Sequence, residues 1–238
     1  AATGEIATDE ELGGAEMHCQ VAGTAEYLAE DDRDGIRIAR EILSHLGWET
    51  DQKPAAAIKE PLYDAEELLG IVPADTKRPY DIREIIARVV DGSDLFDFKS
   101  EYDNGTVCGH ARIGGRPIGI IANNAPITAK GATKAAQFIQ LCDQSNIPLW
   151  FIHNTTGFLV GTAQEHDGII KHGSKLIQAV ANARVPRFSL VIGGSYGAGN
   201  YAMCGRGLDP RFIFSWPTSK VAVMGGPQGG QVMRIVAE

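Results

Sequence analysis

A glycine-rich stretch from Phe188 to Gly205, "FSLVIGGSYGAGNYAMCG", carries the residue types best suited to chemistry. Its Gly193–Gly197 segment matches the G-x-S-x-G elbow of serine hydrolases. The overlapping Gly197–Ala202 segment matches the G-x-G-x-x-A turn of dinucleotide-binding folds. A third interpretation assigns the chemistry to the backbone. A turn of small residues that enters a helix presents N–H groups to a developing oxyanion.

Neither of the two side-chain motifs is accompanied by the other residues that its function requires. The hydrolase elbow places its histidine after the serine in the chain, but the last histidine here is His172. We therefore expect Ser195 to be a turn or cap residue. A dinucleotide site needs an acidic residue about 20 positions further on, and no Asp or Glu occurs from Pro210 to Ala237. The backbone interpretation stays open beside a structural one, in which the glycines serve only tight strand–helix packing.

Histidines and cysteines give no sign of a metal or nucleophile site. His166 has no second ligand one helical turn away, which favours an exposed residue. His153 lies in an apolar strand and is expected to be a hydrogen-bonded core residue. Cys204 is expected to be buried. The chain has no C-x-x-C pair, which argues against a structural zinc or disulfide framework and favours a reducing compartment.

The composition excludes two classes of partner. The chain has 238 residues, 44% of them hydrophobic, and a net charge of −8. The negative charge argues against nucleic acid or an anionic membrane surface as a partner. No apolar run approaches the roughly 18 residues of a membrane span.

The first part of the chain predicts a helix and then a connector. Helical spacing over 31–46 ends at Gly47, and the proline-containing stretch 51–80 is irregular. Asp81 and Glu84 suggest a capping box for a helix that ends at Gly92. A boundary between two units is therefore expected between Lys53 and Tyr80.

The second part alternates strands with helices. Gly114 and Gly115 indicate a hairpin, followed by helices over 129–144 and 169–182. Apolar strands are expected at "PLWFIHN", "RFSLVIG", "FIFSW" and "KVAVM". This pattern predicts an α/β fold with a largely parallel sheet. The loops "NTTGFLVGT", "GGSYGAGN" and "GGPQGG" are expected to meet at one edge of it.

Several longer stretches resemble the carboxyltransferase (beta) subunit of biotin-dependent acyl-CoA carboxylases. They are "GGAEMHCQVAGTAEYLAEDDRDGIRIAR", "GIVPADTKRPYDIREIIARVVDGS", "NTTGFLVGTAQEHDGIIKHGSKLIQAV", "GGSYGAGNYAMCGR" and "WPTSKVAVMGG". The stretch "SYGAGNYAMCGR" resembles the methylcrotonoyl- and geranyl-CoA carboxylase branch more than the propionyl- and acetyl-CoA branch. The propionyl- and acetyl-CoA branch typically has an aspartate at the position of Tyr201.

The resemblance implies a crotonase-like spiral of ββα repeats, with the end of one unit followed by most of a second. Residues 1–72 would then be the C-terminal part of the N-terminal unit plus linker, and residues 73–238 a truncated C-terminal unit. The family subunit is longer, and the Gly-Gly pair of its thioester oxyanion hole has no counterpart in this chain. The chain is therefore expected to be a fragment that is inactive alone.

The resemblance also implies the reaction and its partners. The carboxyl group passes from carboxybiotin, carried on a biotin carboxylase/biotin carrier (alpha) subunit, to an acyl-CoA through a thioester enolate. The expected substrate is 3-methylcrotonoyl-CoA or geranyl-CoA. Alternatives are a propionyl- or acetyl-CoA carboxylase subunit, a biotin-independent crotonase-type hydratase or isomerase, and a non-catalytic assembly module. A hexamer of beta subunits is implied, without a metal, in the bacterial cytoplasm or, for a eukaryote, the mitochondrial matrix.

The resemblance assigns site residues by position. The backbone of Ala198 and Gly199 would form the oxyanion hole for the biotin ureido carbonyl, with Gly197 permitting the bend. Substrate-binding residues would be Thr156, Gly157, Phe158, Tyr196 and Tyr201, together with Phe98, Lys99, Asn123 and Asn124 of the hairpin region.

Overall fold

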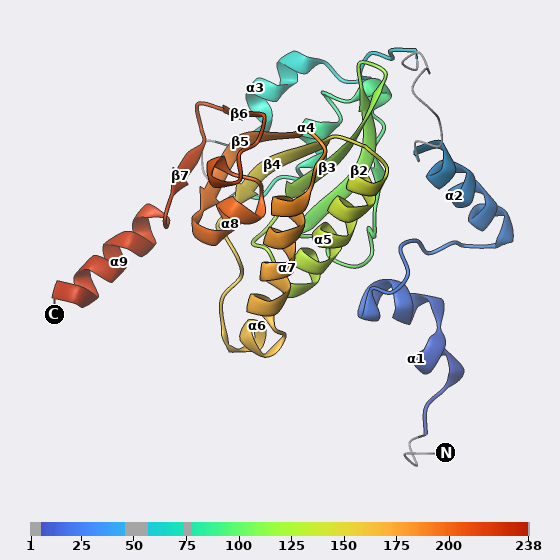
Figure 1. Cartoon of the computed structure of the whole chain (residues 1–238), viewed down its shortest axis with the longest axis horizontal. Coiled ribbons are helices and arrows are strands. Elements are labelled where there is room, and N and C mark those ends of the chain that lie inside the picture. The colour runs from blue at the N-terminus through green and yellow to red at the C-terminus, as the bar shows by residue number, and fades with distance from the viewer. Residues whose placement is uncertain (1–5, 46–56, 74–77, 238) are drawn as a thin grey trace.

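A mixed β-sheet with helices on both faces forms the centre of the molecule (Figure 1). The computed structural model describes residues 6–45, 57–73 and 78–237. The sheet order is β1-β2-β3-β4-β5-β6, with β7 paired to the end of β5. The strands are β1 (Phe96–Asp97), β2 (Thr106–Ile113), β3 (Arg116–Asn123), β4 (Leu149–Thr155), β5 (Arg187–Tyr196), β6 (Phe212–Ser215) and β7 (Lys220–Ala222).

The sheet is antiparallel at one side and parallel at the other. β2 and β3 form the predicted hairpin, in which Ile113 pairs with Arg116 around a two-residue turn. Gly114 and Gly115 both have positive φ, at 59° and 74°, as a primed turn requires. From β3 to β7 all pairings are parallel, so the carboxyl ends of these strands share one edge. The predicted α/β class is confirmed.

Two long helices cover one face of the sheet. They are α5 (Ala129–Gln144), with Thr128 as its side-chain cap, and α7 (Ile169–Asn182). The α5 residues expected to face inward, Ala135, Phe138, Ile139 and Cys142, have no exposed surface. They pack with strand residues such as Ile121 and Phe151 in the larger apolar core. Short helices α6 (Thr162–His166) and α8 (Gly197–Ala202) connect these elements to the sheet.

The opposite face is covered by shorter helices. These are α3 (Leu68–Ile71) and α4 (Arg83–Ile86), with 3-10 turns at Ala65–Glu67 and Asp91–Ser93. Ile82, Ile85 and Ile86 are fully buried in a second apolar core. The predicted capping box is wrong. The Asp81 carboxylate does accept a hydrogen bond from the Arg83 N–H, but the Glu84 carboxylate binds the Arg88 guanidinium instead of an N–H at the helix start.

The two ends of the chain extend from this body (Figure 1). α1 (Asp9–Gly13), a π-helix (Met17–Ala22) and α2 (Asp32–His45) precede the sheet, and the Tyr27 ring stacks on Phe96. The helix predicted over 31–46 corresponds to α2, and its predicted end at Gly47 lies outside the described residues. The same holds for residues 51–56 and 74–77 of the predicted connector.

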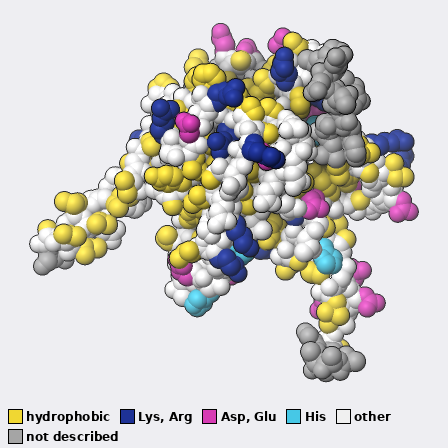
Figure 2. All heavy atoms as spheres, viewed as in Figure 1, with side chains coloured by type: hydrophobic (Ala, Val, Ile, Leu, Met, Phe, Trp, Pro, Cys, Tyr) yellow, Lys and Arg dark blue, Asp and Glu magenta, His cyan; other side chains and the backbone are white. Residues whose placement is uncertain are grey.

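At the other end, a 3-10 turn (Arg206–Leu208) precedes β6, and α9 (Gly226–Ala237) has no buried residue. Figure 2 shows hydrophobic side chains along this C-terminal arm. "GGPQGG" was predicted as a loop, but most of it forms the first turn of α9. No helix within the described parts of the chain has the length and apolarity that a membrane crossing requires.

Candidate functional site

Two loops meet backbone to backbone at the carboxyl edge of the parallel strands. A Cβ atom on Gly199 would lie only 2.6 Å from the Gly157 Cα. The Gly157 φ of 116° is a conformation that favours glycine. Its carbonyl accepts a hydrogen bond from the Ile127 N–H at 2.9 Å, and its N–H donates to Thr155 Oγ1 at 3.2 Å. The loop after β4 is thus fixed against the turn after β5, as expected for loops that share one site.

The turn after β5 presents backbone donors. Gly197 has a φ of 52°, which bends the chain from the strand into α8. The N-cap residue, Tyr196, makes no side-chain hydrogen bond to the helix, and the first N–H groups of a helix lack intrahelical acceptors. Ala198 is exposed and Gly199 is buried. Because Ala198 carries only a methyl group, an oxygen atom can approach this backbone closely.

The side chains predicted to surround this turn differ in their exposure. Thr156 is exposed and Tyr201 is half exposed. The Phe158 ring packs on α7, where a Cβ on Gly173 would lie 3.0 Å from it. The Tyr196 ring lies beside Gly194, 2.9 Å from the position of an added Cβ. The structure therefore places Gly157 and Tyr196 at this turn, whereas the Phe158 ring lies against α7.

Ser195 is a strand residue, so the expectation of a turn or cap residue is wrong. It lies in β5 without exposed surface, and its Oγ is 2.9 Å from Nδ1 of His153 on the neighbouring strand. The Asn200 amide also donates to this Oγ at 2.8 Å. The expectation of a hydrogen-bonded core histidine is confirmed. The hydrolase motif did not indicate this pair, because its histidine follows the serine in the chain, whereas His153 precedes Ser195 and the sheet brings the two together.

Burial excludes this serine as an accessible nucleophile. Neither Ser195 nor His153 has exposed surface, and among the described residues Nε2 of His153 has no hydrogen-bond partner. Burial also lowers the pKa of His153 to about 4, against a weaker effect of the Met203 carbonyl, so the ring is neutral at pH 7. Cys204 is buried as expected, and burial raises the pKa of its thiol to about 11.

The predicted binding residues of the hairpin region contact their own chain. Phe98 is 2% exposed and packs on Phe138, with ring centroids 5.2 Å apart. The Lys99 ammonium donates to the Gly23 carbonyl, and it lies 3.5 Å from the Glu26 carboxylate. Asn123 has no exposed surface. The assignment of these residues to substrate binding stays a prediction.

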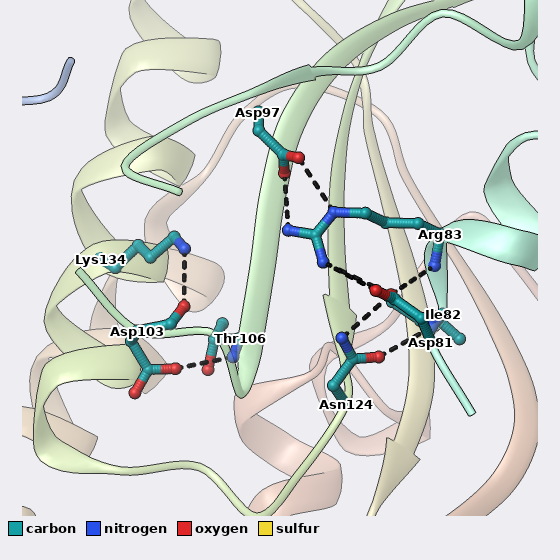
Figure 3. Close-up of polar contacts among 8 residues, drawn as sticks. All are labelled: Asp81, Ile82, Arg83, Asp97, Asp103, Thr106, Asn124 and Lys134. Atoms are coloured by element: carbon teal, nitrogen blue, oxygen red, sulfur yellow. Dashed lines mark hydrogen bonds and ion pairs between the residues drawn. The ribbon is translucent and has the colours of Figure 1, made fainter. Parts of the chain in front are cut away.

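Asn124 joins the carboxyl end of β3 to the start of α4 (Figure 3). Its amide oxygen accepts a hydrogen bond from the Ile82 N–H at 2.7 Å, and its amide nitrogen donates to Asp81 at 3.0 Å. The Arg83 guanidinium forms a two-point contact with Asp97, at 2.9 and 3.1 Å. In the same region the Lys134 ammonium donates to the Asp103 carbonyl, and burial lowers the pKa of this lysine. No group of three His, Cys, Asp or Glu side chains in the described ranges could hold a metal ion.

Comparisons with known proteins show the family of the chain. The carboxyl transferase domain family matches residues 1–236. The beta subunit of geranyl-CoA carboxylase from P. aeruginosa is 70% identical in sequence, with a TM-score of 0.75 over 98% of this chain and 45% of that one. The mitochondrial methylcrotonoyl-CoA carboxylase beta chain of Dictyostelium discoideum is 50% identical over 98% of this chain and 40% of its own length.

The chain is also similar to a solved structure that contains bound ligands. The transcarboxylase 12S structure, described as a hexamer with methylmalonyl-coenzyme A and methylmalonic acid bound, has a TM-score of 0.89 at 37% identity. That match covers 99% of this chain and 46% of the other. The chain thus spans slightly less than half of the length of these relatives.

Proposed function

Since the chain belongs to the carboxyl transferase domain family, we propose that it is part of the carboxyltransferase subunit of a biotin-dependent acyl-CoA carboxylase. The observation that carries this proposal is the backbone contact of Gly199 with Gly157, which places a turn of small residues at the shared edge of the parallel strands. Ligands of such sheets bind at this edge.

The acyl-CoA that we propose is a branched enoyl-CoA, 3-methylcrotonoyl-CoA or geranyl-CoA. Support comes from the 70% identity to a geranyl-CoA carboxylase subunit and the 50% identity to a methylcrotonoyl-CoA carboxylase chain. The transcarboxylase, crystallised with methylmalonyl-coenzyme A, is less similar, at 37% identity.

The residues of the turn fit a bound ureido carbonyl. When bound, carboxybiotin supplies the carboxyl group that is transferred. Ala198 and Gly199 would donate their N–H groups to the ureido oxygen, and Gly197 would set the bend by its positive φ. Thr156 and Tyr201 would line the entrance, since both are exposed beside the turn. This use of the backbone needs no side-chain nucleophile, in agreement with the buried state of Ser195 and Cys204.

The hairpin residues Phe98, Lys99, Asn123 and Asn124 would act on the acyl-CoA side by shaping the sheet edge. We also propose the partners of the relatives: a biotin-carrying subunit and a hexamer of complete beta subunits. Residues 1–72 and 73–238 would belong to two crotonase-like units. The relatives include bacterial and mitochondrial proteins, so the compartment would be the cytoplasm or the mitochondrial matrix according to the source.

The test of the donor assignment is Ala198→Pro in the complete subunit, assembled with its biotin-carrying partner. Proline removes an N–H group of the first helical turn, where this group has no intrahelical acceptor. We expect kcat for carboxyl transfer to fall by about 100- to 1,000-fold. The matched control is Ala198→Ser, which keeps the N–H group and should retain activity. Equal activity of the two folded variants would contradict the assignment.

The unmodified complex provides the baseline for this comparison. It is measured with propionyl-, 3-methylcrotonoyl- and geranyl-CoA. We expect kcat/KM to be higher for the two branched enoyl substrates than for propionyl-CoA. A preference for propionyl-CoA would contradict the proposed substrate class, whereas the absence of any carboxyl transfer would contradict the proposed reaction.

A further inference from the structure

Three polar side chains, two of them fully buried and one half-buried, are connected by hydrogen bonds at the α8 turn. His153, Ser195 and Asn200 come from β4, the end of β5 and the first turns of α8. Ser195 Oγ receives a hydrogen bond from the Asn200 amide at 2.8 Å and lies 2.9 Å from His153 Nδ1. Ser195 Oγ thus accepts one hydrogen bond from Asn200 and shares a second with Nδ1 of His153, in which the histidine tautomer sets which of the two atoms donates. The three side chains form one connected set of hydrogen bonds.

These hydrogen bonds connect the two ends of the turn whose N–H groups are proposed to bind the ureido oxygen. Ser195 precedes the N-cap residue Tyr196, and Asn200 follows Gly199. The Ser195–Asn200 bond thus closes a loop around Tyr196–Gly199. Asn200 is held a second time, since its backbone carbonyl accepts the Gly205 N–H at 2.7 Å. A rotation of the turn would break these contacts.

The burial of these polar side chains lowers the stability of the folded chain, which suggests that they have a function. His153 and Ser195 have no exposed surface, and Nε2 of His153 has no hydrogen-bond partner among the described residues. His153 pairs with the apolar Val191 of β5. A buried polar atom without a partner costs about 1–3 kcal/mol, whereas an apolar side chain of similar shape would avoid this cost.

We propose that His153, Ser195 and Asn200 are positioning residues that hold the N–H groups of Ala198 and Gly199 in the direction of the developing charge. This proposal rests on the proposed function of the α8 turn. His153 and Ser195 touch no substrate, since both are fully buried. They act through the backbone of the turn. A misplacement of the donors by about 1 Å can cost on the order of 100-fold in rate.

The test compares two serines of the same strand in the complete subunit with its biotin-carrying partner. Ser195→Ala removes the bridging hydroxyl. Ser189→Ala is the matched control, because Ser189 is also fully buried in β5 and donates one hydrogen bond, to the Cys204 carbonyl. We expect Ser195→Ala to lower kcat by about 10- to 100-fold with an unchanged KM for acyl-CoA, and Ser189→Ala to leave kcat within about twofold.

A second readout does not depend on activity. Amide hydrogen exchange of residues 196–201 should become faster in Ser195→Ala and stay unchanged in Ser189→Ala. Asn200→Ala should have the same effect as Ser195→Ala, and its half-buried position favours correct folding. His153→Asn, whose amide can take the place of Nδ1, should keep more activity than His153→Ala.

The outcomes separate this inference from the proposed function. Equal kcat values for Ser195→Ala and Ser189→Ala, with unchanged exchange of residues 196–201, would overturn the positioning role. If the unmodified complex transfers no carboxyl group, the proposed function fails, and the exchange comparison still decides whether the three side chains hold the turn.

Discussion

Gly157 and Gly199 show how small residues can carry a function at this site. Their backbones are in contact. A Cβ atom at Gly199 would overlap the Gly157 backbone, and a side chain at Gly157 would be strained by the positive φ of that residue. The polar side chains nearby, Ser195 and His153, are buried. We infer that the side chains of this site support the backbone, which provides the donors.

The cysteines give a prediction at the residue scale. All four are buried and free. Burial raises the pKa of Cys108 to about 12 and that of Cys204 to about 11. The thiolate population of Cys204 at pH 7 is then on the order of 100-fold below that of an ordinary thiol, and access is restricted as well.

We therefore expect the folded chain to react with 5,5′-dithiobis(2-nitrobenzoate) only after denaturant is added. An added cysteine at the exposed position Ser174 (Ser174→Cys) should react at once and is the control. Rapid reaction of the four native thiols in the folded chain would contradict the buried environment.

At the scale of elements, α5 and the hairpin pack without space between them. Gly119 of β3 faces Cys142 of α5, and a Cβ atom at Gly119 would lie 2.5 Å from the Cys142 Sγ and 3.2 Å from the Phe138 ring. The glycine is thus required for close approach of the helix to the sheet. Because β3 pairs in parallel with β4, this packing holds the carboxyl end of β3 at the same edge as that of β4.

This contact predicts the effect of Gly119→Ala on stability. We expect the free energy of unfolding to fall by about 1–3 kcal/mol, because the added methyl group overpacks the core. Denaturant titration measures the change. Gly230→Ala in α9 is the control, since an added Cβ there meets no atom within 4 Å and alanine favours a helix.

A double variant identifies the cause of this loss. Cys142→Ala removes the sulfur atom that an alanine at position 119 would meet, so the Gly119→Ala change should cost less in that background. If its cost is the same in both backgrounds, the overlap with Cys142 is not its cause.

At the scale of the whole molecule, one sheet separates two apolar cores, and histidines are buried against it. His110 is 8% exposed on β2, where its ring stacks with His45 at 5.5 Å and lies 4.9 Å from Phe138. Burial, with a smaller effect of His45, lowers the pKa of His110 to about 4, and burial does the same for His153.

These histidines predict how stability depends on pH. Between pH 6.5 and about 4 the unfolded chain binds protons at these positions that the folded chain does not bind, so stability falls as pH falls. Each histidine contributes about 1.4 kcal/mol per pH unit of this window, on the order of a few kcal/mol in total. The stability is fully present above pH 6.5 and is lost toward pH 4.

Denaturant titrations from pH 7 to pH 4 measure this loss. His110→Gln should reduce the slope of stability against pH relative to the unmodified chain. The same slope in the variant and in the unmodified chain would contradict the assignment to His110.

The sequence by itself indicated most of the elements and the family. Local signals such as the Gly114–Gly115 turn, the inward face of α5 and the apolar strands were sufficient, because hydrophobic periodicity and turn chemistry are properties of neighbouring residues. The stretch "SYGAGNYAMCGR" likewise indicated the family. Since no histidine follows Ser195 in the chain, it argued against a hydrolase elbow and left a backbone function of the turn open beside a packing role.

Only the tertiary structure decided which distant residues meet. The pairing of β4 with β5 brings His153 to Ser195, 42 positions further along the chain, and the fold of the loops brings Gly157 to Gly199. The pairing of β7 with β5 and the burial of Phe98 were also decided by the sheet. Strand order and burial depend on contacts between segments far apart in the chain, which no local spacing specifies.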